Sequence, residues 1–322
     1  MWLPARKTRD LRRHIKCTSR RWLLKEFLCK ICGAATEESG AKIGKWKQRP
    51  FHLRRCPKCG YAFISDPLAD YDEIYSPEYY AGHGADPLLD YIYELEYPAK
   101  SIRMYEWRGI RTAVSSLCKV GPNTNWLDFG CGNGGLVRYC RDACRIVGFE
   151  KAGWIRDQST KHGIPVLTEV ELEPLSGTFD IVTAIEVLEH VGEPVEFLRT
   201  IRGLLRPGGL FFCTTGNPAP HRSNLIEWPY VLPETHISFY EPETLSRALR
   251  TAGFRPEYRG YLPGYTDIMR FKTLKNLMRF RLLENLHPFK RAAWHEVIPW
   301  ELTGRILDRK LKILAHPIAW AE

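Results

Sequence analysis

The chain has 322 residues, a hydrophobic content of 44% and a formal net charge of +10. This length suits one large α/β domain with a small appended module, and the apolar content is enough for a sizeable core. The positive charge is compatible with nucleic acid, an anionic membrane face or a phosphate-bearing substrate, and it selects none of them. The sequence shows no apolar run that reaches the length of a membrane span. Residues 1–26 are rich in Arg and Lys without an apolar core, so we expect a solvated basic arm and not a secretory signal.

Residues 27–66 contain two CxxC pairs, each followed by a glycine. Each pair places two thiolates on one side of a tight turn, and four thiolates complete a closed tetrahedral site of the structural kind. The spacing therefore predicts a zinc ribbon, with iron as the second choice of metal. Four unligated core cysteines, or a redox pair, are the alternatives. The other six cysteines are scattered, which favours a reducing, cytoplasmic location. The predicted zinc ligands are Cys29, Cys32, Cys56 and Cys59.

Basic and aromatic residues surround these cysteines. A ribbon of this kind can bind nucleic acid, but basic solvated faces are common and this one has no recognised base-reading motif. Nucleic-acid binding is therefore an alternative that the sequence does not favour. The residues concerned are Lys25, Lys30, Lys45, Lys47, Arg54, Arg55, Lys58, Trp46 and Phe51.

Residues 67–120 form a tyrosine-rich segment. The range from about Asp90 to Leu117 has a helical pattern that only Pro98 interrupts. We expect this segment to form a helical lid or substrate-binding element, in which Tyr79, Tyr80 and His83 could cover a site. Core packing of the tyrosines is the alternative.

From residue 121 short apolar runs alternate with helical stretches, which predicts a parallel sheet covered on both faces. We assign residues 121–262 to this catalytic domain, with a further helix at Leu245–Ala252. Residues 263–322 are predicted to be a basic carboxyl-terminal extension, because no clear strand rhythm follows from about Gly260. The predicted strands are Asn125–Phe129, Arg145–Phe149, Pro165–Leu167, Phe179–Ala184 and Leu210–Thr215.

A glycine-rich turn follows the first of these strands and leads into a helix. Its glycines allow a positive φ and let a ligand approach the backbone. The turn also fits the dinucleotide pattern GxGxxG, but the carboxylate of Asp128, just before it, would repel a pyrophosphate and suits a cationic ligand. The candidate ligand-binding residues in this stretch are Asp128, Gly130, Cys131, Gly132 and Gly134.

Glu150 ends the second strand, twenty positions after Gly130. An acid at that place can accept hydrogen bonds from both ribose hydroxyls of an adenosine, a feature that several nucleotide cofactors share. Glu150 and the adjacent Lys151 therefore extend the predicted ligand-binding set. A solvated carboxylate at a strand end is the alternative for Glu150.

The run from Trp126 to Gly135 resembles motif I of class I methyltransferases, including the type 11 and type 23 groups. Phe179–Val191 resembles their fourth-strand motif, and Leu204–Leu210 resembles the turn into their fifth strand. This resemblance covers roughly residues 120–255. It implies a Rossmann-like, doubly wound α/β fold with a seven-stranded sheet, and S-adenosylmethionine lying across the carboxyl ends of its first strands. It also places Glu186 in the donor site and His190 where the acceptor could be oriented.

The loop Glu234–Tyr240 resembles one in bacterial sugar C-methyltransferases, which also have an amino-terminal ribbon and a tyrosine-rich segment. His236 matches the histidine proposed as their catalytic base. Thr235 stands where that group has an acid, and no counterpart of its carboxyl-terminal domain is found, so a keto-sugar acceptor does not follow. Histidine suits proton transfer because its ordinary pKa lies near neutral. A core or helix-leading histidine is the alternative for His236, and a structural role is equally open for His190.

The leading hypothesis is an S-adenosylmethionine-dependent methyltransferase for a small polar acceptor, such as a sugar or another metabolite. A second hypothesis is an RNA or protein methyltransferase that docks through the basic ribbon, and a third is a non-catalytic protein that only binds the donor. The acceptor, its methylated atom and the oligomeric state are left open by the sequence.

Overall fold

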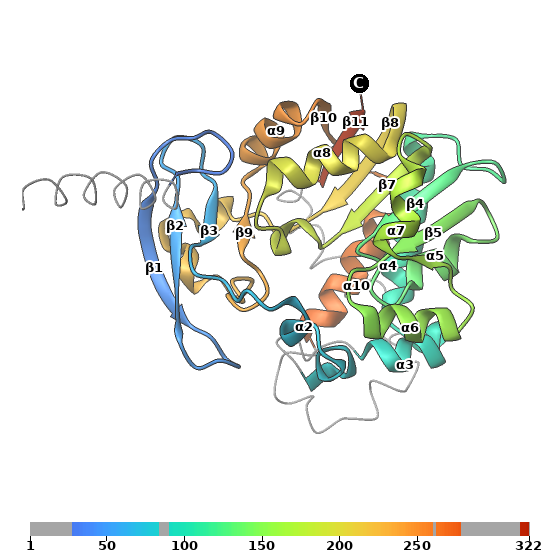
Figure 1. Ribbon diagram of the computed structural model, residues 1–322, viewed down its shortest axis with the longest axis horizontal. Coiled ribbons are helices and arrows are strands. Elements are labelled where there is room, and N and C mark those ends of the chain that lie inside the picture. The colour runs from blue at the N-terminus through green and yellow to red at the C-terminus, as the bar shows by residue number, and fades with distance from the viewer. Residues whose placement is uncertain (1–27, 84–89, 260–261, 278–315, 322) are drawn as a thin grey trace, which may run out of the picture.

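The computed structural model describes residues 28–83, 90–259, 262–277 and 316–321, and the predicted basic arm at residues 1–26 lies outside them. The described chain contains two β-sheets, which lie side by side in Figure 1. The smaller one is antiparallel and has the strand order β1-β2-β3-β9. Its strands are β1 (Glu37–Ile43), β2 (Pro50–Arg55), β3 (Ala62–Ile64) and β9 (Ser238–Phe239).

The larger sheet has seven strands in the order β10-β11-β8-β7-β4-β5-β6. The five strands from β4 to β8 pair in parallel, whereas β11 runs antiparallel to both β8 and β10. The predicted Rossmann-like doubly wound sheet is thereby confirmed. The strands are β4 (Asn125–Phe129), β5 (Arg145–Phe149), β6 (Val166–Leu167), β7 (Phe179–Ile185), β8 (Leu205–Thr214), β10 (Phe254–Arg259) and β11 (His316–Ala321).

Helices cover both faces of the seven-stranded sheet. Successive residues of a strand point to opposite faces, so neighbouring residues pack under different helical layers. Trp126 and Ile181 pack into the core under one helical layer, while their neighbours Leu127 and Val182 pack into the core under the other. The first layer holds α4 (Arg103–Leu117), α5 (Gly135–Cys140), α6 (Gly153–Lys161) and α10 (Tyr265–Leu277). The second holds α7 (Glu169–Leu172), α8 (Pro194–Leu204) and α9 (Pro242–Thr251).

The tyrosine-rich segment forms several short helices rather than one long one. The helical range predicted from Asp90 to Leu117 is divided at Pro98, which begins a single 3₁₀ turn between α3 and α4. Proline lacks a backbone N–H donor, so a helix starts at it more readily than it passes through it. The short helices of this segment are α2 (Tyr71–Ile74), η1 (Tyr79–His83), α3 (Tyr91–Glu96) and η2 (Pro98–Lys100). Three more lie later in the chain: η3 (Glu173–Leu175), η4 (Leu188–His190) and η5 (Ala219–Glu227).

The range predicted to be a basic carboxyl-terminal extension contributes two elements to the main domain. Helix α10 packs against α4, and β11 is inserted between β8 and β10. The expectation that no strand follows Gly260 was therefore wrong. Pro317 obscures the strand signal because proline is rare inside a sheet, and the pairing of β11 with β8 begins only at Ile318. Within the described residues, no helix is both long and apolar enough to cross a membrane.

Candidate functional site

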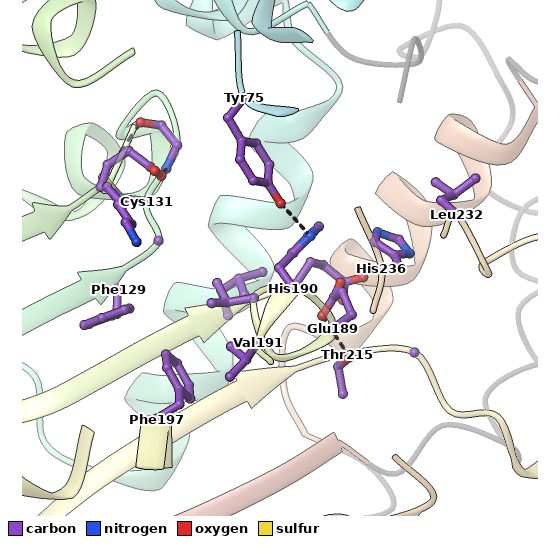
Figure 2. A pocket seen from close by; sticks show the side chains of 18 of the residues that line it. Tyr75, Phe129, Cys131, Glu189, His190, Val191, Phe197, Thr215, Leu232 and His236 are labelled. Carbon is purple, nitrogen blue, oxygen red and sulfur yellow. Dashed lines mark hydrogen bonds between the residues drawn. The ribbon is translucent and has the colours of Figure 1, made fainter. Parts of the chain in front are cut away.

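A cavity of about 1170 Å³ opens at the carboxyl ends of the central parallel strands. The chain runs outward from β4 through β5 to β6 and then returns to β7 on the other side of β4. In open α/β sheets ligands bind at such a topological switch point. Phe129 at the end of β4 packs against Phe149 at the end of β5, and both line the cavity. Phe197 lies next to Phe129 (Figure 2).

The glycine-rich loop forms one side of this cavity. The backbone N–H groups of Gly130 and Cys131 both donate to the carbonyl of Phe149, at 2.8 and 3.1 Å, which holds the loop against β5. Gly130 has a φ of 72°, and a Cβ at this position would lie 2.7 Å from a methyl carbon of Val187. Gly130, Cys131 and Gly132 line the cavity. Gly134 instead caps α5 and is not among the lining residues.

Glu150 lines the same side and binds the loop directly. Its carboxylate accepts hydrogen bonds from the N–H groups of Gly132 (2.9 Å) and Ala152 (3.0 Å) and a longer one from the hydroxyl of Tyr71 (3.4 Å). Burial raises the pKa of Glu150, and the bonds from Ala152 and Gly132 oppose that rise. The neighbouring Lys151 is exposed and lies over the ring of Tyr71 at the rim.

Asp128 occupies a different position from the one expected for a cation ligand. Its side chain is buried, accepts a 2.7 Å hydrogen bond from the hydroxyl of Thr183 on β7, and is not among the residues that line the cavity. Burial raises the pKa of Asp128 to about 7. Asp128 therefore lies behind the glycine loop, where it links β4 to β7.

Arg103 is a cavity residue that the sequence analysis did not identify. It begins α4, donates to Glu106 at 3.1 Å and lies over the ring of Tyr91. Its Nη1 is buried and 3.7 Å from a carboxylate oxygen of Glu94, without a hydrogen-bond partner among the described residues. A buried guanidinium nitrogen of this kind is suited to bind an anionic group of a ligand. Nothing in the sequence marks Arg103, because it lies within the predicted helical range Asp90–Leu117 and far from any motif.

Glu186 follows β7 and also lines the cavity, next to Glu189 and the two histidines, and its predicted contact with the donor stays a prediction. It has a φ of 55°, which is unusual for a residue other than glycine. Its carboxylate accepts hydrogen bonds from Thr214 (2.9 Å) and Tyr230 (3.0 Å) and pairs with Lys272 of α10 (2.9 Å). Burial alone would raise the pKa of Glu186, but Lys272 and these hydrogen bonds hold it well below its usual range.

A second carboxylate, Glu189, lies next to Glu186 and Lys272, and its pKa is shifted in the opposite direction to that of Glu186. It is fully buried and accepts a 2.8 Å hydrogen bond from the hydroxyl of Thr215, and its other oxygen lies within hydrogen-bond distance of the hydroxyl of Tyr230. Burial and the nearby charge of Glu186 raise the pKa of Glu189 to about 8. Two neighbouring acids are thus held in different protonation states at neutral pH, an arrangement that often marks a functional site.

His190 and His236 lie beside Glu189, with ring centroids 4.9 Å apart, and both line the cavity (Figure 2). The Nδ1 of His236 is 2.7 Å from the carbonyl of Tyr230, and the Nδ1 of His190 is 2.8 Å from the carbonyl of Thr235. Because a carbonyl only accepts, Nδ1 of His236 carries the proton and the lone pair of its neutral form is on Nε2.

The tyrosine-rich segment lines the cavity between the glycine-rich loop and the two histidines. Tyr79 and Tyr80 are buried in the cavity wall, whereas His83 is exposed and does not line it. The hydroxyl of Tyr75 lies 2.8 Å from Nδ1 of His190, which links this segment to the histidines (Figure 2). The predicted proximity of Tyr79 and Tyr80 to the site agrees with this geometry, and a lid movement stays a prediction.

The four cysteines of the amino-terminal module come together as the spacing predicts. Their sulfur atoms lie within 4.8 Å of one another, with Cys29–Cys59 and Cys32–Cys56 both at 3.5 Å. Sulfur atoms around a tetrahedral zinc lie ~3.8 Å apart, so the cluster fits that metal. Gly33 and Gly60 close the two turns by donating to the carbonyls of Cys29 and Cys56.

Comparison with known proteins shows what the part of the chain around this site is similar to. Residues 99–258 match a family model described as a methyltransferase domain. Ubiquinone biosynthesis O-methyltransferase of Dinoroseobacter shibae is 33% identical over 147 residues, which cover 40% of this chain and 59% of that protein. The enzyme of the same name in Xanthomonas campestris is 32% identical over 149 residues, or 41% and 62%. The chain thus spans roughly three fifths of the length of these curated relatives.

Among solved structures, phosphoethanolamine N-methyltransferase 2 of Haemonchus contortus matches with a TM-score of 0.47 and 13% identity, covering 80% of this chain and 60% of that one. Geranyl diphosphate C-methyltransferase of Streptomyces coelicolor matches with a TM-score of 0.43 and 14% identity, covering 68% and 78%.

Proposed function

We propose that this chain, whose residues 99–258 belong to the class I S-adenosylmethionine-dependent methyltransferase family, transfers a methyl group from that donor to a small polar acceptor. One observation carries the proposal. A single cavity joins the glycine-rich loop on one side to Glu189, His190 and His236 on the other, so a donor and a small acceptor can meet inside it. We call these the donor side and the acceptor side.

The donor side fits S-adenosylmethionine at both ends of that molecule. Glu150 at the end of β5 would accept hydrogen bonds from the ribose hydroxyls, and the buried Nη1 of Arg103 would bind the α-carboxylate. The donor, when bound, supplies a methyl carbon that the positive charge on its sulfur makes electrophilic. Alignment of the two reactants is then the main contribution of the protein, because a well-oriented pair gains ~7 kcal/mol or more over free reactants.

The acceptor side supplies proton transfer where the acceptor is a hydroxyl or a carbon acid. We propose His236 as the base, since its Nδ1–H is bound to the carbonyl of Tyr230 and its Nε2 is the basic atom. His190 would orient the acceptor, and Tyr75 and Thr235 hold its ring. The protonated Glu189 would donate a hydrogen bond within this cluster without adding a negative charge.

A titration tests the donor assignment. Calorimetry with S-adenosylmethionine, S-adenosylhomocysteine and NAD is expected to show binding of the first two only. Radiolabelled methyl transfer to fractions of polar metabolites, compared with RNA and protein fractions, then tests the acceptor class. Binding of NAD without response to the other two would overturn the donor assignment, and label confined to RNA or protein would overturn the small acceptor.

A further inference from the structure

The four-cysteine module, residues 28–64, is joined to the acceptor side by backbone pairing. Strand β3 begins three residues after Cys59 and pairs with β9, which begins two residues after His236. The register places Ala62 opposite Phe239, and the N–H of Ile64 donates to the carbonyl of Ile237 at 3.0 Å. The small sheet, seen beside the main sheet in Figure 1, therefore continues directly into the loop that carries His236.

Buried side-chain contacts strengthen this connection at the cysteines themselves. The hydroxyl of Tyr61 lies 2.8 Å from that of Ser238, which donates to the carbonyl of Val191 at 2.6 Å. Thr244 donates from its hydroxyl to the carbonyl of Cys59. Tyr61 is completely buried, so its bond is shielded from water and fixes the relative position of the two segments.

Charged and backbone contacts connect the rest of the module to the same part of the chain. The backbone N–H groups of Trp46 and Lys47, in the turn between β1 and β2, donate to the buried carboxylate of Glu234 at 2.7 and 3.0 Å. Arg55 of β2 binds the buried Glu241 at 2.8 Å. The amino group of Lys30, which stands between two of the cysteines, donates to the carbonyl of Gly192 at 2.7 Å.

The donor side is held by other contacts. Its loop is bound to the carbonyl of Phe149 and to Glu150, and Asn133 donates from its side chain to the carbonyl of Tyr91. These partners belong to the main sheet and the tyrosine-rich segment. The contacts of the four-cysteine module described above, in contrast, end between residues 191 and 244, and the module reaches the tyrosine-rich segment through the ion pair of Lys47 with Glu73 of α2, which is partly exposed and so contributes little.

We propose that the four-cysteine module is a positioning element for the acceptor side, so that metal binding by its thiolates orders the loop around His236 and leaves the glycine-rich loop unaffected. The name "acceptor side" rests on the proposed function, but the coupling itself does not require any methyl transfer. Because a closed thiolate site holds its two turns in place only while the metal is bound, its loss releases β3 and, through β3, β9.

Hydrogen exchange on the full chain, measured with zinc bound and after chelation, tests this coupling. Freshly prepared protein is expected to hold about one zinc per chain. Chelation is expected to speed exchange of the amides in residues 234–244 by about tenfold or more, while exchange in residues 129–135 and the affinity for S-adenosylhomocysteine stay unchanged. Equal acceleration in both segments, or none in residues 234–244, would overturn the proposal, whether or not an acceptor has been found.

Two neighbouring arginines of β2 provide a matched pair of variants that keep the cysteines intact. Arg55 donates to Glu241 outside the module, whereas Arg54 donates to the hydroxyl and the carbonyl of Thr36 inside it. Arg55→Gln is expected to retain its zinc and to accelerate exchange in residues 238–244 severalfold, and Arg54→Gln is expected to leave that segment as in the wild type. The reverse pattern, or a fall in S-adenosylhomocysteine affinity in Arg55→Gln, would show that the module does not act on the acceptor side alone.

Discussion

The donor and acceptor sides of the cavity are built in different ways. The donor side comes mainly from two successive strand ends, so that Gly130, Gly132 and Glu150 lie within about twenty residues of one another. The acceptor side combines η4, the segment after β8 and helix α10, and its backing comes from the four-cysteine module. One side is thus local in sequence, and the other depends on contacts between residues that are more than a hundred positions apart.

The two sides also differ in how they hold charge. On the donor side, backbone N–H groups surround Glu150 and partly offset the cost of burying it. On the acceptor side, Lys272 keeps Glu186 ionised, and the charge of Glu186 in turn helps keep Glu189 protonated at neutral pH. We therefore expect a substitution on the donor side to change the affinity for the donor, and one on the acceptor side to change the rate of methyl transfer.

The largest expected effect is on turnover and concerns His236. If its Nε2 takes a proton from the acceptor, His236→Asn should lower kcat by ~10²–10⁴-fold, the usual range for the loss of a general base. Donor affinity should change little, because the residue does not contact the glycine-rich loop. Single-turnover methyl transfer by the folded variant, with donor bound and with an acceptor found by the radiolabel assay, measures the effect.

His162→Asn, at the exposed end of α6, is the matched control for this variant. It should transfer methyl groups at the wild-type rate. If His236→Asn does the same, His236 is not the base, and the two sides of the cavity differ less than proposed.

The donor side could be predicted from the sequence better than the acceptor side. The strand at Asn125–Phe129 and the glycine-rich turn after it were predicted correctly, and Glu150 lies at the predicted strand end, because short-range patterns determine these positions. Their contacts with a donor stay a prediction. Tyr230 and Lys272 could not be found this way. Tyr230 lies in an irregular segment and Lys272 in a range expected to be an extension, and only the packing of α10 against α4 brings Lys272 to Glu186. The role of Asp128 was inferred from its charge, but burial places it behind the loop.

The next largest effect is expected on donor affinity. Glu150→Gln replaces one carboxylate oxygen by an amide that donates, and this amide would face the N–H of Gly132 or Ala152. The variant should bind S-adenosylhomocysteine about 10- to 100-fold more weakly, which corresponds to ~1–3 kcal/mol for a charged hydrogen bond. Calorimetry measures this change. Unaltered affinity would mean that the donor does not contact Glu150.

The smallest effect on donor affinity is expected for Asp128→Asn, although the sequence analysis assigned Asp128 and Glu150 to the same ligand-binding set. The amide keeps the acceptor oxygen that Thr183 needs, and the side chain does not line the cavity, so affinity should fall by less than about threefold.

The clearer effect of Asp128→Asn is expected on the pH dependence of stability. Burial raises the pKa of Asp128 from 3.8 to about 7, so the folded state binds the extra proton between these values. The contribution of Asp128 to the free energy of unfolding of the donor-free protein should therefore fall as pH rises from about 4 to about 7. The difference in free energy of unfolding between wild type and Asp128→Asn, measured in urea titrations, should therefore fall across this range, whereas Asp142→Asn at an exposed position should keep the wild-type pH dependence. A large loss of donor affinity in Asp128→Asn, without a change in this pH dependence, would mean that Asp128 acts on the ligand directly and that the donor side extends behind the glycine-rich loop.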